Sequence, residues 1–154
     1  MNPAFMRLAI GEARSGFRKG EGGPFGAVVV LDGRVVGRGR NRVLAARDPT
    51  AHAEVVAIRR AARRLGRWHL AEAELYATCE PCPMCLAAIH WARIKRVYYG
   101  CTTEDAARIG FDDKIFFESL GRLGNLRVEI VPFLRDECLP LFEEWFNRPD
   151  RVVY

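Results

Sequence analysis

Two short motifs combine residue types that bind zinc with one that can carry protons. The first is His52-Ala53-Glu54 and the second is Pro81-Cys82-Pro83-Met84-Cys85. Imidazole nitrogen and cysteine thiolate are ligands that zinc prefers. Cys82 and Cys85 are three residues apart at the expected start of a helix, where both sulfurs can face one point and the positive helix end favours thiolates. The pattern therefore predicts a zinc ion held by His52, Cys82 and Cys85.

A set of three protein ligands leaves one position of the metal open. In a catalytic zinc site a water fills that position, and zinc lowers the pKa of this water to about 7. Glu54 lies two residues from the predicted ligand His52, so it can take a proton from the water and return it to the substrate and the leaving group. We therefore predict a hydrolytic enzyme with one zinc ion per subunit and a bound water or hydroxide.

Other interpretations of the cysteines stay open. A closed structural zinc site could use Cys79 as a fourth ligand, although Cys79 ends a predicted strand and is expected to point elsewhere. A pair of cysteines on an apolar helix is often part of the core. A thioredoxin-like redox pair would not come with an upstream His-Ala-Glu. The chain has five cysteines, an odd number, and its N-terminal residues do not resemble a secretion signal, so we expect no disulfide framework.

The elements that must position these residues alternate between strand and helix patterns. Asp32-Gly33 separates two β-rich runs, Phe25–Leu31 and Arg34–Gly39, which is a strong hairpin signal. A helix is predicted from about Ala51 to Leu65. Its buried face is expected to consist of apolar residues at helical spacing, namely Val55, Ile58, Ala62 and Leu65. The other predicted elements are helices over Phe5–Phe17, Pro83–Arg93 and Leu139–Phe146, and strands over Glu74–Thr78, Arg96–Gly100 and Arg127–Val131.

A hairpin followed by alternating helices and strands indicates an α/β layered fold with a mixed sheet. The length of 154 residues suits a single domain over residues 1–154. A composition of 49% hydrophobic and 28% charged residues excludes disorder, collagen and small disulfide scaffolds. Apolar runs such as Ala27–Leu31 are too short to span a bilayer, so we expect a cytoplasmic protein with no membrane partner.

The charge balance is positive. Lys and Arg number 24 against 19 Asp and Glu, which gives a net charge of +5 at pH 7. The helix predicted to begin near His52 carries an arginine stripe at spacings of three and four, made of Arg59, Arg60, Arg63, Arg64 and Arg67. Such a stripe can follow nucleic-acid phosphates, but it is more often a solvated helix face. We therefore expect no nucleic-acid partner.

The two motifs together resemble the signature of the cytidine deaminase-like superfamily, H-x-E followed by P-C-x-x-C. The resemblance implies a three-layer α/β/α fold around a five-stranded mixed sheet, and hydrolytic removal of a ring amino group as ammonia. A longer resemblance, to bacterial guanine deaminases, lies in residues 22–28, 48–55, 78–85 and Gly110-Phe111-Asp112-Asp113. It implies deamination of guanine to xanthine. Guanosine deaminases share the Gly-Phe-Asp-Asp pattern, and tRNA adenosine deaminases resemble the first three segments, so both stay as alternatives.

The resemblance implies roles for individual residues of this chain. His52, Cys82 and Cys85 would hold the zinc, and Glu54 would shuttle protons. Asp113 would join it in catalysis by contacting the imidazole side of the ring. The residues expected to contact or shape the substrate are Asn41, Phe25, Ala53, Trp91 and Asp112. Read without the resemblance, Asn41 could instead cap a turn, Phe25 and Trp91 could belong to the core, and the two aspartates could be solvated loop charges.

The resemblance also implies a homodimer. In guanine deaminases the C-terminal segment, here about residues 133–154, is exchanged between two subunits, and a terminal aromatic residue closes the partner's pocket. Tyr154 is the matching residue in this chain. Two other interpretations remain at this point: Tyr154 could be a frayed terminus, and the motifs could belong to a zinc module without enzymatic activity.

Overall fold

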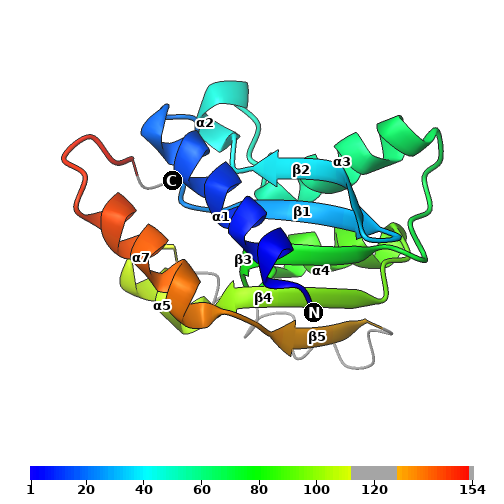
Figure 1. Cartoon of the computed structure of the whole chain (residues 1–154). Helices are drawn as coiled ribbons and strands as arrows, with labels where there is room; N and C mark the ends of the chain where they lie inside the picture. The colour runs from blue at the N-terminus through cyan, green and yellow to red at the C-terminus, as the bar shows by residue number, and fades with distance from the viewer. Residues whose placement is uncertain (112–127, 153–154) are drawn as a thin grey trace.

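Five strands form one mixed sheet in the order β2-β1-β3-β4-β5 (Figure 1). The structure is a computed structural model, which describes residues 1–111 and 128–152. β1 runs antiparallel to both of its neighbours, β2 and β3, whereas β3, β4 and β5 run parallel to one another. The strands are β1 (Gly26–Leu31), β2 (Arg34–Arg40), β3 (Glu74–Cys79), β4 (Arg96–Cys101) and β5 (Glu129–Pro132).

The predicted hairpin joins β1 and β2. Asp32 and Gly33 at its tip have φ angles of 49° and 70°, the left-handed conformation that a tight two-residue turn requires. The antiparallel register then places Gly26 opposite Arg40. The end of β2, the start of β1 and the end of β3 therefore lie side by side, at the same end of these strands.

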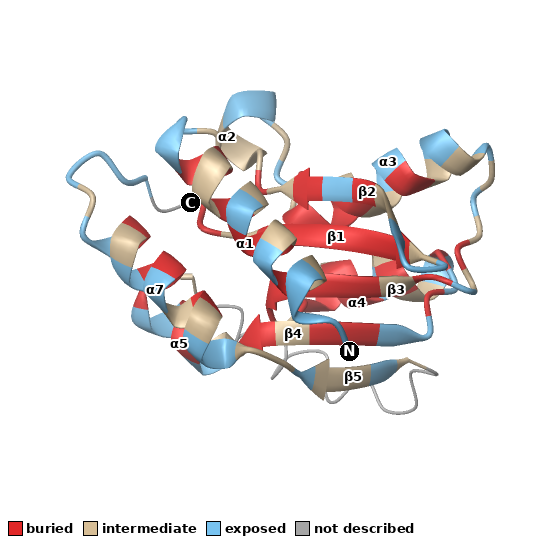
Figure 2. Cartoon of the chain, viewed as in Figure 1, coloured by how far each residue is buried: buried red, intermediate tan, exposed pale blue. Residues whose placement is uncertain are grey.

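Helices cover both faces of the sheet and confirm the predicted three-layer architecture. On one face, α1 (Pro3–Arg18) and α7 (Arg135–Phe146) pack in a core with Val28, Tyr76 and Tyr98. On the other face, α3 (Ala53–Leu65) and α4 (Pro83–Trp91) pack in a second core with Val29 and Leu75. Figure 2 shows β1 and β3 buried along most of their length, while α3 turns an exposed side to the solvent.

The sequence analysis did not predict two short helices, α2 (Val43–Ala46) and α5 (Thr103–Arg108). Neither is long enough to display a helical repeat of apolar residues. A capping box at Thr102 and Asp105 begins α5, and such a pair is visible in a sequence. The last helix also begins four residues earlier than predicted, at Arg135 rather than Leu139.

The predicted buried face of α3 was wrong in part. Val55 is buried, but Ile58, Ala62 and Leu65 are only partly buried. The side turned to the sheet consists instead of small residues four apart, namely Ala53, Ala57 and Ala61. They face Gly37 and Gly39 of β2, where an added Cβ would lie 2.3 Å from the Ala57 carbonyl oxygen and 2.0 Å from the Ala53 carbonyl oxygen. Small residues on both sides bring the helix backbone close to the strand.

Replacing Gly39 with alanine should therefore destabilise the protein. The new methyl group would meet backbone at Ala53, which can move only if the start of α3 moves. We expect a loss of about 1–3 kcal/mol in the free energy of unfolding, measured in urea. Gly11→Ala is the matched control, because no heavy atom lies within 4 Å of its added Cβ. In the middle of α1, that change should raise the stability by about 0.5–1 kcal/mol. Equal effects at the two glycines would contradict this packing.

The C-terminal helix lies on α1 of the same chain. Ion pairs join Arg7 to Glu137 at 2.9 Å, and Glu144 to Arg14 at 3.0 Å and Arg18 at 2.7 Å. An exchange of this segment between two subunits would bury the same surfaces, so the exchange and the dimer stay predictions. A helix with the length and apolar character needed to cross a membrane does not occur in residues 1–111 and 128–152.

A buried carboxylate connects α5 to α7. The Asp105 side chain is 1% exposed and accepts two hydrogen bonds from the Arg135 guanidinium, at 2.6 and 2.7 Å. Hydrogen bonding to Arg135 lowers the pKa of Asp105 below its ordinary value, and burial opposes the shift. A lowered pKa means that the stabilisation is complete above the ordinary carboxyl pKa of about 4 and is lost as the pH falls through the lower folded value.

Asp105→Asn should accordingly lower the free energy of unfolding at pH 7 by about 1–3 kcal/mol. The difference from the wild type should shrink below about pH 4, where the wild-type carboxylate begins to bind a proton. Urea unfolding at pH 7 and pH 3 measures both values. Asp150→Asn is the control, because Asp150 pairs with Arg148 at 2.6 Å but its side chain is 63% exposed. A difference for Asp105→Asn that is the same at both pH values would contradict the role of the ion pair.

Candidate active site

Two helix N-termini present the predicted zinc ligands. His52 is the N-cap residue of α3 and Cys82 is the N-cap residue of α4, both with extended backbone. Neither side chain makes a capping hydrogen bond to its own helix. Pro83 follows Cys82 at the first helical position, where a missing N–H is tolerated, and Cys85 comes one turn later. The positive ends of two helices therefore converge on one place.

The three side chains fit a tetrahedral metal. The Nδ1 atom of His52 lies 3.7 Å from the Cys82 sulfur and 3.6 Å from the Cys85 sulfur. Ligands at the usual Zn–N and Zn–S distances of about 2.1 and 2.3 Å, held at a tetrahedral angle, would be about 3.6 Å apart. The three ligand atoms all lie within 4.8 Å of one another. One nitrogen and two sulfurs at these separations are suited to zinc.

Glu54 lies in the first turn of α3 and is only 7% exposed. Burial, followed by the charge of Cys82, raises the pKa of Glu54 to about 7, and His52 opposes the shift. A side-chain hydrogen bond also links its carboxylate to Cys85. Glu54 is thus a carboxyl group beside the ligand set that can both accept and donate a proton near neutral pH.

The pKa values of the two predicted ligand thiols are shifted in opposite directions. A hydrogen bond from Cys85 and another from His52 lower the pKa of Cys82 to about 4, against the effect of burial. The same bond to Cys82, together with burial, raises the pKa of Cys85 well above its ordinary value. The chain alone therefore favours a thiolate at Cys82, which is the form that binds a metal.

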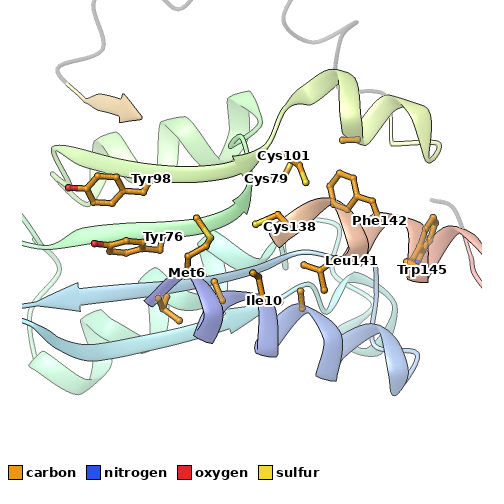
Figure 3. Close-up of a cluster of buried hydrophobic side chains, with 14 of the residues drawn as sticks. Met6, Ile10, Tyr76, Cys79, Tyr98, Cys101, Cys138, Leu141, Phe142 and Trp145 are labelled. Atoms are coloured by element: carbon orange, nitrogen blue, oxygen red, sulfur yellow. The ribbon is translucent and has the colours of Figure 1, made fainter. Parts of the chain in front are cut away.

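Cys79 lies apart from the ligand group. Its sulfur donates a hydrogen bond to the Thr102 carbonyl oxygen at 3.6 Å. In Figure 3 its side chain lies with those of Cys101 and Cys138, in the core that α1 and α7 form with the sheet. Among residues 1–111 and 128–152, only His52, Cys82 and Cys85 form a possible metal-binding group. Cys79 is therefore not placed to be a fourth ligand of the predicted zinc.

Asn41 is buried directly after β2, in a segment that is hydrogen-bonded to the residues before α3. It is 2% exposed, and the following residue, Arg42, donates its N–H to the carbonyl oxygen of Ala51, which precedes His52. The Asn41 Oδ1 atom accepts a hydrogen bond from the Val43 N–H at 3.1 Å. Asn41 therefore does cap the turn into α2, and the position of its amide beside α3 also suits a substrate contact.

Phe25 and Ala53 flank the same region. Phe25 is partly buried and meets the Phe111 and Phe142 rings edge to face, with centroids 4.9 and 5.5 Å apart. Its backbone carbonyl accepts a hydrogen bond from the Asn41 N–H. Ala53 is 1% exposed at the first position of α3. Phe25 thus belongs to an aromatic cluster at the edge of the core.

Trp91 lies away from the ligands of its own chain. It is the last residue of α4 and is 70% exposed, whereas Cys82 precedes the first residue of this helix. Trp91 follows Cys85 by six residues, which is about 9 Å along the helix axis, and its side chain is turned to solvent rather than buried beside the ligands. Asp112, Asp113 and Tyr154 lie outside the described residues.

Glu80 is a residue near the site that the sequence analysis did not single out. It lies between Cys79 and Pro81, and its side chain accepts a hydrogen bond from the Thr103 N–H at 3.3 Å. Its own N–H donates to the Cys101 carbonyl oxygen. The segment before Cys82 is thereby connected to the start of α5. A glutamate at a strand end gives no sign of this contact until its strand is paired with the next.

Comparison with known proteins shows the family to which the chain belongs. The zinc-binding region of cytidine and deoxycytidylate deaminases matches residues 1–101. The chain belongs to this deaminase family. It is 44% identical to guanine deaminase of Bacillus subtilis over 97% of each chain. A crystal structure of Bacillus subtilis guanine deaminase matches all of this chain and 99% of its own, with a TM-score of 0.76 and 43% identity. The predicted superfamily and fold are therefore confirmed.

The deaminase also resembles enzymes that act on RNA. It is 44% identical to a tRNA-specific adenosine deaminase of Aquifex aeolicus over 94% of this chain and 93% of that protein. It is 55% identical to a tRNA-specific adenosine deaminase of Agrobacterium fabrum, over 62% of each chain. All of these relatives are deaminases, which supports deaminase activity in this chain, whereas the substrates in their names differ.

Proposed function

We propose that this deaminase hydrolyses guanine to xanthine and ammonia at a zinc ion held by His52, Cys82 and Cys85. The observation that carries the proposal is the Gly22-Gly23 loop, which brings Asn41 and Phe111 together. A Cβ on Gly22 would lie 2.1 Å from Asn41 Oδ1, and one on Gly23 would lie 2.8 Å from the Phe111 ring. Asn41 is next to the start of α3, and Phe111 directly precedes Asp112 and Asp113. The Gly-Phe-Asp-Asp segment is the one that resembles guanine deaminases.

Zinc bound at this site would supply a water with a pKa near 7 and polarise the reacting centre. Glu54 then takes a proton from the water and delivers protons to the ring nitrogen N3 and to the departing amine. The amide of Asn41 can both donate to and accept from the purine edge, and Asp113 can accept a ring N–H. The water adds to C2, the bond from C2 to the amino nitrogen breaks, and guanine and water yield xanthine and ammonia.

A tRNA adenosine deaminase is the second candidate, because the Aquifex aeolicus enzyme of that kind has the same 44% identity as the Bacillus enzyme over almost the whole chain. Its substrate would bring the adenosine amino group to the same Glu54. Guanine is favoured by Gly110-Phe111-Asp112-Asp113, where the tRNA enzymes typically carry a different loop. A guanosine deaminase would use the same residues in a wider pocket.

Asn41→Ala should lower kcat/KM for guanine about 10- to 100-fold, because a polar group that recognises the base is removed. Asn41→Asp separates this effect from the turn, since its carboxylate can still accept from the Val43 N–H but offers the base no N–H donor. Xanthine formation is followed by ultraviolet absorbance, and guanosine is assayed in parallel. Asn147→Ala, on the exposed end of α7, should match the wild type. Full activity of Asn41→Asp would exclude donation by Asn41, and faster turnover of guanosine than of guanine would overturn the free base as substrate.

A further inference from the structure

The solvent side of α3 carries arginines that the deamination site does not use. This α3 basic face consists of Arg59, Arg60, Arg63, Arg64 and Arg67, of which all but the partly buried Arg67 are exposed. It begins about two turns beyond His52 and continues past the opposite end of the helix. The apolar side of α3 packs on the sheet, so the basic face is the side left to solvent (Figure 2).

Acidic residues balance only part of the α3 basic face. Arg59 approaches Asp48 at 3.6 Å, and Arg67 pairs with Glu72 at 3.0 Å. Arg60 and Arg64 instead donate to backbone carbonyls of β2, at 3.0 and 3.3 Å. Within the part of the chain that the structure describes, Arg60, Arg63 and Arg64 form no ion pair with a carboxylate. Each of the two hydrogen-bonded guanidinium groups uses only one of five N–H donors.

The spacing of these arginines opposes helix stability. Two like-charge pairs within α3, Arg59 with Arg63 and Arg60 with Arg64, are four residues apart, a spacing at which like charges destabilise a helix. The negative end of the helix favours Arg63 and Arg64 in the last turn, but Arg59 and Arg60 stand in its middle. A polyanion bound along the face would relieve this repulsion.

An exposed aromatic side chain follows the last arginine of the α3 basic face directly in the chain. Trp68 is 67% exposed and follows the C-cap residue Gly66 by two positions. Its ring meets His69 edge to face, with centroids 5.5 Å apart. An exposed indole at the end of a row of arginines is the combination with which proteins bind unpaired nucleic acid, since arginines contact phosphates and the ring stacks on a base.

We propose that the α3 basic face and Trp68 bind single-stranded nucleic acid at a surface separate from the deamination site. The phosphates would lie along Arg60, Arg63 and Arg64, and one unpaired base would stack on Trp68. A membrane surface suits the face less well, because an interfacial helix inserts an apolar side and the apolar side of α3 is packed on the sheet. The exposed tryptophan and the arginines without carboxylate partners thus favour a nucleic-acid partner, against the expectation from composition.

Fluorescently labelled 15-nucleotide poly(U) RNA and oligo(dT) test the proposal by polarisation from 50 to 300 mM salt. Both should bind, because neither phosphate contacts nor stacking require a 2′-hydroxyl. Three phosphate contacts predict that log K falls with log salt at a slope of about −2, since each contact on a single strand contributes about −0.7. Arg63→Ala should weaken binding several-fold and reduce the slope by about 0.7. Trp68→Ala should weaken binding at least about fivefold, and Trp68→Phe should restore most of it.

Lys19→Ala is the matched control for charge, because Lys19 is exposed at the C-cap of α1 and does not belong to the α3 basic face. Lys19→Ala should leave the affinity within about twofold. Lys19→Ala and Arg63→Ala should both keep the circular dichroism and guanine turnover of the wild type. Equal losses in Lys19→Ala and Arg63→Ala would mean that net charge alone attracts the oligonucleotide, which overturns the proposal. So would an absence of binding at 50 mM salt, or binding to phosphatidylserine vesicles without binding to either oligonucleotide.

Discussion

Replacing Glu54 with glutamine should lower kcat for guanine by about 100- to 10,000-fold while the protein keeps its zinc. The amide has the size of the carboxylic acid but cannot take a proton from water. Burial raises the pKa of Glu54 to about 7, which suits proton transfer, and it is the only acidic residue in the first turn of α3, so no neighbour in that turn can replace it. Xanthine formation and zinc content, measured on the same preparation, give both numbers.

Glu72→Gln is the control for Glu54→Gln, because it makes the same chemical change at a side chain that is 58% exposed and pairs with Arg67. This variant should turn over guanine at the wild-type rate. The zinc content separates the two ways in which Glu54→Gln could lose activity. Loss of activity together with loss of metal would assign Glu54 to the metal site rather than to proton transfer, and a wild-type rate would exclude a catalytic Glu54.

Replacing Cys82 with serine should remove both the metal and the activity. Serine keeps the shape of the side chain, but its hydroxyl is a poor zinc ligand beside a thiolate. Loss of outer-sphere partners already costs about 10- to 100-fold in metal affinity, so loss of a ligand should cost more than 100-fold. Because zinc binds the folded chain, the variant should also unfold at a lower temperature than the zinc-loaded wild type. Competition with a chromophoric chelator measures the affinity.

Cys79→Ser is the control for Cys82→Ser. Cys79 is close in sequence, but its sulfur donates to the Thr102 carbonyl oxygen, a bond that a serine hydroxyl can also make. We expect one zinc ion per chain and wild-type activity in this variant. Loss of zinc from Cys79→Ser would indicate a closed site with four protein ligands, which has no position for water and would contradict the proposed mechanism.

The metal ligands could be predicted because their sequence signals are local. His52 and Cys82 both stand at the N-cap position of a helix, and Pro83 marks the start of α4 in the sequence. The hairpin was predictable for the same reason, since Asp32-Gly33 defines its turn without help from the rest of the chain.

Features that depend on distant pairings could not be predicted in this way. The burial of Ala57 and Ala61, rather than Ile58 and Leu65, follows from the two glycines of β2 that lie under α3. Periodicity alone ranks large apolar residues as the buried ones, and it carries no information about the opposite surface. The bond from Thr103 to Glu80 likewise requires β3 and β4 to be paired in register.

Trp91 illustrates a third limit, because a residue can match a family pattern and still lie far from the ligands of its own subunit. At the end of α4 and 70% exposed, its side chain is turned to solvent and is free to contact another copy of the chain. A sequence reports which residues are present, but it does not say which subunit a pocket draws them from.

One competition experiment tests the central claim most directly. Zinc-loaded protein is given equal concentrations of guanine and of a tRNA anticodon stem-loop with adenosine at the first anticodon position, and xanthine and inosine are quantified by chromatography over time. The account predicts that xanthine and ammonia form in equal amounts, and that no inosine forms on the same time scale. Inosine without xanthine would contradict guanine as the substrate, although it would leave the zinc ligands and Glu54 in their roles.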